Sequence, residues 1–330
     1  MNDQQNRFLE KTFEFGRTLY NATLGTVLGR LQRMRETKAW REARDMPKGK
    51  ARTIAFNAVH KVFGPTEFGL AIIANNHRKA SGRNDIGAHE AQNIGKTVWK
   101  ALQRHMFRKA GRPRFKSFRR GLNSIEGTNN QEIMYKPERG AIVWRKHVMP
   151  YMKLDTGYMK EALASDLHVK YCRIVRRTLN GVKRWFVQLV VEGLPPVRKV
   201  CAPKCEVVGI DPGPSRIAYF HEQHAAIVEV APHVDLQEPK IRLLQRRIDR
   251  SRRANNPDNY NPDGTVKKGS STWNTSNRGR RTAAKLAEHH RCLAATRKRD
   301  HGELVNDLLQ IGGTIKIEKN NYRSFQRCFG

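Results

Sequence analysis

The sequence is poor in acidic residues, and this shortage is the strongest constraint on what the protein binds. It has 30 Asp and Glu against 63 Lys and Arg, which gives a formal net charge of +33. A charge this far from zero repels itself unless a polyanion is nearby, and nucleic acid is the usual polyanion. The composition therefore indicates a protein that binds nucleic acid.

Long apolar runs and paired cysteines are missing as well. No apolar stretch approaches the ~20 residues of a membrane helix, and the polar start, Met1–Gln5, is unlike a secretory signal. The five cysteines are odd in number and scattered, which excludes a disulfide framework and fits a reducing compartment. We therefore expect a cytoplasmic protein that does not enter a membrane.

The first third of the chain, residues 1–120, is expected to be a helical domain. Apolar residues between Leu9 and Met34 recur at steps of three, four or seven, which is the spacing of one face of a long helix. Apolar stretches at 54–63 and 91–105 predict two further helices.

A basic connector closes this helical part, at residues 108–120. It interleaves Lys and Arg with Phe115 and Phe118. In one interpretation the cations contact a nucleic-acid backbone while the rings stack on bases. In the other, the segment is a solvated linker whose two Phe side chains pack on a neighbouring element. Three cations are candidate nucleic-acid ligands: Arg112, Arg114 and Lys116.

A β-rich domain is expected at residues 121–200. Asn180-Gly181 favours a tight hairpin turn, because both residues tolerate positive φ. Stretches rich in β-branched and aromatic residues flank this turn on both sides, as expected for two strands. Pro195-Pro196 ends the block and marks a domain boundary.

The remaining residues, 201–330, are expected to form a third domain with short strands and two helices. Gly312-Gly313 ends the second helix, as glycine does past a helix end. The chain is thus predicted to be an α+β multi-domain protein. The expected strands are 207–210, 217–220, 225–230 and 314–317, and the expected helices are 239–254 and 278–310.

Two acidic residues of this third domain each follow a short apolar strand. Gly209-Ile-Asp-Pro-Gly213 places Asp211 at a strand's carboxyl end, and Glu318 follows the last strand. Carboxylates are hard oxygen ligands that suit Mg²⁺ or Mn²⁺. Two acids on neighbouring strands can hold two metal ions roughly 4 Å apart, which activate water and stabilise the leaving oxygen of a phosphodiester.

Each acid also has a plainer interpretation. Asp-Pro-Gly is good turn chemistry, and a Glu after a strand is usually a solvated end residue. The strand pattern before Asp211 also opens the sugar-kinase and actin-like folds, although the large positive charge argues against a small-molecule kinase.

The most basic segment lies between the two acids, where residues 240–300 hold 17 Lys or Arg against five acids. Like charges four residues apart weaken a helix. A stripe of them without matching acids therefore indicates an external counter-ion such as phosphate. The plainer interpretation is an ordinary solvated helix face. The stripe consists of Arg242, Arg246, Arg250 and Arg253.

Together these residues resemble the TnpB family, the OrfB-type proteins of insertion sequences that are related to type V CRISPR effectors. Gly209–Gly213 resembles the first RuvC motif of that family, and Ile315-Lys-Ile-Glu318 resembles the second. Other similar segments are Leu244–Arg250, Asn256-Pro257, Trp273–Ser276, Gly111–Lys116 and Ser124–Gly127.

The resemblance implies a transposon-associated, RNA-guided DNA endonuclease that cleaves in its full-length form. Its parts would be a helical recognition lobe, a β-barrel-like wedge domain and a RuvC-like nuclease domain of RNase H-like fold. Guide RNA and target DNA would be its partners and Mg²⁺ or Mn²⁺ its cofactor. By motif, Asp211 matches the first catalytic, metal-binding acid and Glu318 the second.

Two other functions compete with this one. The first is a truncated or nuclease-inactive relative that holds RNA and DNA without cutting. The second, weaker one is an unrelated basic RNA-binding protein, which the two motif acids and the basic helices between them speak against.

The sequence departs from the family pattern near its end. No third acidic motif follows Glu318, and the paired Cys-x-x-Cys zinc module has no counterpart, because Cys201 and Cys205 have three residues between them and no second pair. We therefore expect no zinc site, an incomplete nuclease domain, and weak nuclease activity or none. Nucleic-acid binding depends on spread charge and is expected to survive.

Overall fold

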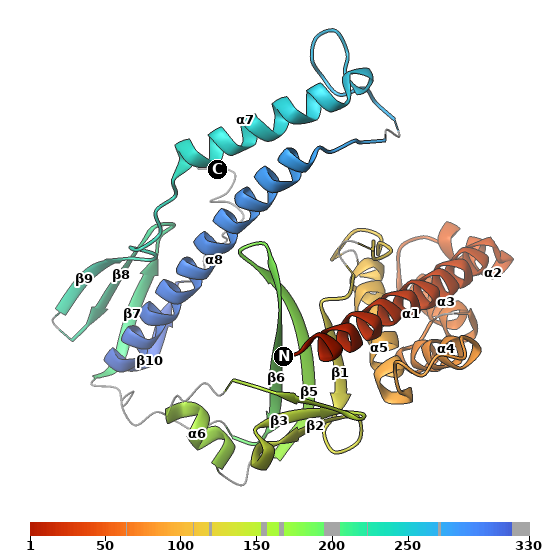
Figure 1. The fold of residues 1–330 in the computed structure, drawn as a ribbon, viewed down its shortest axis with the longest axis horizontal. Coiled ribbons are helices and arrows are strands. Elements are labelled where there is room, and N and C mark those ends of the chain that lie inside the picture. The colour runs from red at the N-terminus through yellow and green to blue at the C-terminus, as the bar shows by residue number, and fades with distance from the viewer. Residues whose placement is uncertain are drawn as a thin grey trace. The chain divides into compact units, whose positions relative to one another are not determined.

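The chain forms an α+β structure with two compact units (Figure 1). A computed structural model describes residues 1–63, 65–107, 109–118, 121–152, 157–164, 168–194, 205–222, 224–269 and 272–318. The first unit comprises Met1–Arg177 and Lys183–Pro195, and the second comprises Thr178–Val182 and Pro196–Gly330. The division into three domains stays a prediction, and the boundary at Pro195-Pro196 falls outside the described residues.

Helices make up the start of the first unit, as the apolar spacing predicts. The longest, α1, begins with a capping box in which the Asn2 and Gln5 side chains each accept a hydrogen bond from the other's backbone N–H, both at 2.8 Å. None of the described helices combines the length and the apolar character needed to cross a membrane. The helices are α1 (Asp3–Glu36), α2 (Lys38–Asp45), α3 (Lys50–Phe63), α4 (Glu67–Ala80) and α5 (Ala88–Met106).

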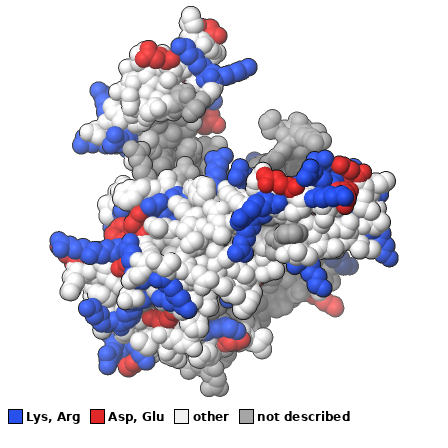
Figure 2. All heavy atoms as spheres, turned by 90° about the vertical axis from the view of Figure 1, so that its right-hand side faces the viewer, with Lys and Arg blue, Asp and Glu red and all other residues white. Residues whose placement is uncertain are grey.

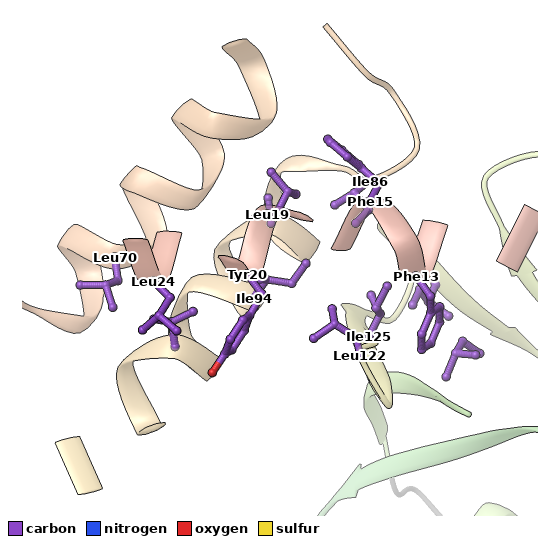
Figure 3. Packing of buried hydrophobic residues seen from close by; sticks show 14 of the residues in the cluster. Phe13, Phe15, Leu19, Tyr20, Leu24, Leu70, Ile86, Ile94, Leu122 and Ile125 are labelled. Atoms are coloured by element: carbon purple, nitrogen blue, oxygen red, sulfur yellow. The ribbon is translucent and has the colours of Figure 1, made fainter. Parts of the chain in front are cut away.

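The apolar face of α1 is the centre of the core of the first unit. Phe13, Leu19 and Leu24 are at most 2 % exposed. They belong to one buried cluster with Leu70 of α4 and Ile94 of α5, in which Leu24 lies beside Leu70 (Figure 3). Burying each large apolar side chain stabilises the fold by about 2 kcal/mol, so α1 is held by packing rather than by helix propensity alone.

Helices α4 and α5 approach each other closely at Gly95. A Cβ added there would lie 2.5 Å from the Leu70 carbonyl oxygen and 2.9 Å from the Ala71 Cα. Both are backbone atoms, which cannot turn aside as a flexible side chain can. The absence of a side chain at this position therefore sets the spacing of the two helices.

Adding a methyl group at Gly95 is expected to destabilise the first unit. Gly95→Ala forces α4 and α5 apart and lowers the free energy of unfolding by about 1–3 kcal/mol, as overpacking does. Gly29→Ala is the control, because an added Cβ on this α1 glycine meets nothing within 4 Å. That variant should gain about 0.5–1 kcal/mol from helix propensity. Urea denaturation measures both, and shifts of the same sign would contradict the packing explanation.

Two small sheets complete the first unit. Their orders are β1-β5-β6 and β2-β3-β4, and the pairs β1–β5, β2–β3 and β3–β4 are antiparallel. The hairpin turn is confirmed, since Asn180 and Gly181 both have positive φ, 48° and 76°. The elements are β1 (Ser124–Thr128), β2 (Ile133–Lys136), η1 (Pro137–Arg139), β3 (Ala141–Trp144), β4 (His147–Pro150), α6 (Gly157–Ala164), β5 (His168–Leu179) and β6 (Val182–Glu192).

These sheets differ from the β-barrel that the family resemblance implies. Within the described residues the strands do not close into a barrel, because β2, β3 and β4 pair only with one another. Each of these strands has only four residues. The first unit is thus helices packed with two open sheets.

The second unit is a mixed sheet followed by a long helical hairpin. Strands β7 (Cys205–Pro212), β8 (Arg216–His221) and β9 (His224–Glu229) form an antiparallel meander. The chain then passes through α7 (Glu238–Asn255), η3 (Pro257–Asn259) and α8 (Asn277–Ile311) to β10 (Gly312–Ile317). Strand β10 lies beside β7 and parallel to it, in the order β10-β7-β8-β9. Parallel neighbours need a long crossover, which the two helices provide (Figure 1).

Gly312 ends α8 where the sequence predicts, but for a different reason. Its φ is −132°, an ordinary extended conformation, so the helix does not end in a left-handed glycine cap. A Cβ added to Gly312 would lie 2.8 Å from Cγ1 of Val208, which is fully buried. Glycine is therefore needed for the close packing of β10 against β7.

Candidate metal centre and nucleic-acid surfaces

The register of the second unit's sheet brings Asp211 and Glu318 to neighbouring positions. Strands β7 and β10 pair in parallel, and the last pair places Ile317 beside Ile210. The next residue on each chain is the acid, so Glu318 follows beside Asp211. Neighbouring strands lie about 4.8 Å apart, so both carboxylates extend from adjacent backbone positions at the carboxyl ends of two strands.

Both acids lie on the same, open face of the sheet. Side chains alternate along a strand, and residues paired across strands point to the same side. Val208 precedes Asp211 by three residues, so it points to the opposite face, where it is fully buried. Asp211 and Glu318 are exposed. Lys316, which is missing from the residues predicted from the sequence, shares the acid face because it precedes Glu318 by two residues.

A shallow hollow of about 630 Å³ lies beside Asp211 on this sheet. Phe220 and Ile227 line it and are 55 % and 71 % exposed. Gly209 also lines it, and a Cβ added there would meet only the Phe220 carbonyl oxygen, at an ordinary 3.8 Å. Packing within the protein therefore does not require glycine at this position. Its effect is to leave the backbone next to Asp211 open to an approaching ligand.

The structure confirms the turn interpretation of the Asp-Pro-Gly sequence. Gly213 donates its N–H to the Arg216 carbonyl oxygen at 3.0 Å. A Cβ added to Gly213 would lie 2.7 Å from that oxygen, so the turn requires glycine. The same short sequence thus makes the turn and leaves Asp211 exposed at the strand end.

The donor chemistry of the acid pair suits a hard divalent cation. Two carboxylates on adjacent strands offer oxygen ligands, which Mg²⁺ and Mn²⁺ prefer. Mg²⁺ in particular is usually held by one or two carboxylates and keeps several waters. An open, exposed position for Asp211 and Glu318 is compatible with that partly hydrated coordination.

A second group of possible ligands lies between the β9–α7 connection and α8. Ligand atoms of His233, Asp300 and Glu303 lie within 4.8 Å of one another. However, Arg299 already pairs with Asp300 at 3.3 Å and with Glu303 at 3.7 Å. His233 donates its backbone N–H to Asp300 at 3.0 Å. These contacts satisfy the carboxylates and tie the connection to α8. Cys201 and Cys328 fall outside the described residues, so the absence of zinc stays a prediction.

The four arginines of the predicted stripe are all exposed on α7. The expectation of a stripe without matching acids is wrong for two of them, because each has an acid four residues earlier on the helix. Arg246 and Arg250 make no ion pair with an acid in the described part of the chain. They are therefore the members of the stripe available to an external anion. The two internal pairs are Arg242–Glu238 at 3.0 Å and Arg253–Asp249 at 3.2 Å.

The described part of the basic connector, residues 109–118, is anchored to α1. Asn21 donates to the Lys116 carbonyl oxygen at 3.0 Å and accepts from the Lys116 N–H at 2.8 Å. Phe115 and Phe118 are 58 % and 77 % exposed, although the Arg17 guanidinium lies over the Phe118 ring, 6.0 Å from its centroid. Their exposure favours the stacking interpretation over the packed linker. Arg112 and Arg114 are exposed in the same segment.

The excess of positive charge is not confined to one element. Figure 2 shows Lys and Arg side chains in several separate places on one face of the molecule, with Asp and Glu beside some of them. Unpaired clusters are therefore more informative about binding than the net charge alone.

No family model and no curated protein matches the sequence. Solved structures match the chain, among them the structure described as "Cryo-EM structure of the Cas12f1-sgRNA-target DNA complex". That similarity has a TM-score of 0.45 and 11 % sequence identity, and it covers 96 % of this chain. It covers 65 % of the other chain, so the protein spans less than two thirds of that chain's length.

Proposed function

We propose that the protein is a transposon-associated, RNA-guided DNA endonuclease of the TnpB-like kind, with a metal centre at Asp211 and Glu318. One observation carries the proposal. Two acids that are far apart in the sequence, each in a RuvC-like motif, occupy adjacent positions on the open face of a mixed sheet.

Each residue of this face has a chemical part in the proposed reaction. Asp211 and Glu318 would hold Mg²⁺ or Mn²⁺ through their carboxylate oxygens. When bound, such ions activate a water and stabilise the leaving oxygen of a phosphodiester. Gly209 leaves room for a nucleic-acid strand to approach the sheet. Lys316 places a positive charge on the face that a phosphate would meet.

The proposed partners are guide RNA and target DNA. The net charge of +33 suits two polyanions. Arg246 and Arg250 on α7 and the exposed connector beside Phe115 are candidate contacts to their backbones. Base pairing between guide and target would carry the sequence specificity, so the protein itself needs few base-specific contacts.

The test begins by identifying the RNA that the protein binds in a cell that carries its native locus. The protein is purified, its bound RNA is sequenced, and duplex DNA matching that RNA is added with Mg²⁺. Cleavage should require the matching sequence and should stop when EDTA removes the metal or when RNase removes the RNA. Cleavage that persists without RNA, or the absence of bound RNA, would contradict the proposal.

A binding protein without nuclease activity is the second candidate. The observation that favours it is the set of unpaired cations such as Arg246 and Arg250, because phosphate contacts do not depend on the carboxylates. Under this alternative the protein still binds RNA and protects matching DNA, but the DNA stays intact with Mg²⁺ present.

Arg246→Ala and Arg250→Ala are each expected to weaken nucleic-acid binding. Each removes one phosphate contact, so the slope of log affinity against log salt should fall by ~1. Arg242→Ala is the control, since this arginine is already paired with Glu238 at 3.0 Å and should change the slope less. Fluorescence anisotropy across a salt series measures all three. An unchanged slope for Arg246→Ala and Arg250→Ala would remove both residues from the interface.

A further inference from the structure

We propose that a groove between α7 and α8 binds the sugar-phosphate backbone of a single nucleic-acid strand. The inference rests on the proposed function for the identity of the strand. It shares Arg250 with the predicted stripe and assigns binding to four further cations. The groove encloses about 700 Å³. Its positive side chains are Arg247, Arg250, Arg278, Arg281 and Lys285.

The groove is built by contacts that fix the two helices side by side (Figure 1). At Gly279 a Cβ would lie 3.0 Å from Ser251 Oγ, so glycine permits a close approach of α8 to α7. Ser251 Oγ lies 3.0 Å from Ser276 Oγ at the start of α8. Asn256 is 5 % exposed. It accepts from the Asn274 N–H at 2.6 Å and donates to the Asn274 carbonyl oxygen at 2.8 Å. The loop ends are thereby held together.

The cations in the groove lack the acidic partners that other cations on these helices have. No Asp or Glu lines the groove. Within the described residues, none of the five cations makes an ion pair with an acid. Outside the groove some arginines of the same helices pair with acids, although Arg246 does not in the described part of the chain. The pairs are Arg242–Glu238, Arg253–Asp249, Arg291–Glu288 and Arg299–Asp300. Like charges gathered in this way repel one another, so an external anion is the missing partner.

The extent of the cluster favours a chain of phosphates over a single small anion. Arg278 and Lys285 are two turns apart on α8, and a rise of 1.5 Å per residue separates them by roughly 10 Å. Arg247 and Arg250 face them from α7 across the groove. A hollow of about 700 Å³ is the size of a small-molecule pocket, which admits a few linked phosphates of one strand but not a duplex.

The test compares two triple variants of α8 with the same change in charge. The groove variant is Arg278→Gln, Arg281→Gln and Lys285→Gln. The control is Arg280→Gln, Arg297→Gln and Lys298→Gln, which are exposed on the same helix and do not line the groove. Binding of labelled single-stranded RNA and DNA of one sequence is measured by anisotropy in EDTA across a salt series.

The groove variant should bind about tenfold more weakly, and its salt slope should fall by about 2, which is ~0.7 for each contact to a single strand. The control variant should lose less affinity, and its salt slope should fall by less. A loss with both probes indicates a general backbone site, and a loss with RNA or DNA alone identifies the strand. Equal behaviour of the two triple variants with both probes would overturn the proposal.

One further variant keeps the test independent of folding. Arg281→Gln alone changes one exposed side chain and should reduce the salt slope by ~0.7, even if the triple variant is unstable. Because the assay contains EDTA, its result does not depend on a metal bound at Asp211 and Glu318. A negative result for the groove therefore does not contradict the proposed metal centre. A negative result for the metal centre likewise does not contradict the groove.

Discussion

Asp211→Asn is expected to lower the rate of the proposed metal-dependent DNA cleavage, which the sequence predicts to be weak, by at least about 100-fold. Asparagine keeps the size of the side chain but removes the negative charge that a divalent cation requires. Glu318→Gln should have the same effect, because the register of β7 and β10 places both acids at one site. The double variant should be no worse than either single variant, since residues that act as a unit are not additive.

The control for this prediction is Glu206→Gln. Glu206 is exposed on β7, and alternation along the strand places it on the face opposite Asp211. This variant removes one negative charge from the same strand and should cleave as the unmodified protein does. All variants should still bind RNA. Full cleavage by Asp211→Asn would exclude the acid from the metal centre.

Stability of the first unit is expected to fall as the pH rises from 4.5 to about 7, because of Glu90. Glu90 is 1 % exposed and accepts hydrogen bonds from Trp144 Nε1 and from the Gly87 N–H. Burial, with a smaller effect from the Glu132 carboxylate, raises the pKa of Glu90 from 4.5 to about 7. The folded protein therefore holds this proton more tightly than the unfolded chain does. The resulting stabilisation is complete below pH 4.5 and is lost as the pH passes the folded-state pKa, at a total of about 3 kcal/mol.

Glu90→Gln should flatten this pH dependence. A glutamine stays neutral at every pH and can still accept from Trp144 Nε1 through its amide oxygen. Glu67→Gln, at an exposed acid in the first turn of α4, is the control and should keep the slope of the unmodified protein. Urea denaturation at a series of pH values measures all three proteins. An equally steep decline in Glu90→Gln would show that another group causes it.

Features that depend on local sequence could be predicted before the fold was known. The steps of three, four and seven between Leu9 and Met34 predict α1, because helical periodicity is a property of the segment itself. Asn180-Gly181 predicts its hairpin for the same reason, since positive φ is tolerated at both residues. Both predictions are confirmed in the structure.

Features that depend on packing could not be predicted in this way. Glu90 follows Gly87 by three residues, which is typical of a helix cap, and no local signal indicates that Trp144 buries it. Gly312 was expected to stop a helix, whereas its contact with Val208 is a tertiary one. The barrel implied by resemblance also depends on pairing between distant strands, and the described strands of the first unit form two open sheets instead.

The candidate sites lie between these two cases. Strand patterns single out Asp211 and Glu318, but only the parallel register brings them together, and their catalytic role stays a prediction. The spacing of arginines on α7 is visible in the sequence. The groove is not, because Arg278, Arg281 and Lys285 join it only when α8 folds back along α7. Side chains alternate between the two faces of a strand. That alternation along β10 could have placed Lys316 on the same face as Glu318 from the sequence alone.

The most direct test of the central claim is Mn²⁺ binding, measured by electron paramagnetic resonance without nucleic acid. One site that needs both carboxylates predicts that Asp211→Asn and Glu318→Gln each weaken Mn²⁺ binding by about tenfold or more, while Glu206→Gln leaves it unchanged. The measurement does not depend on cleavage, so it tests the metal centre in a chain of any activity. Equal Mn²⁺ affinity in all four proteins would contradict the claim that Asp211 and Glu318 form one metal site.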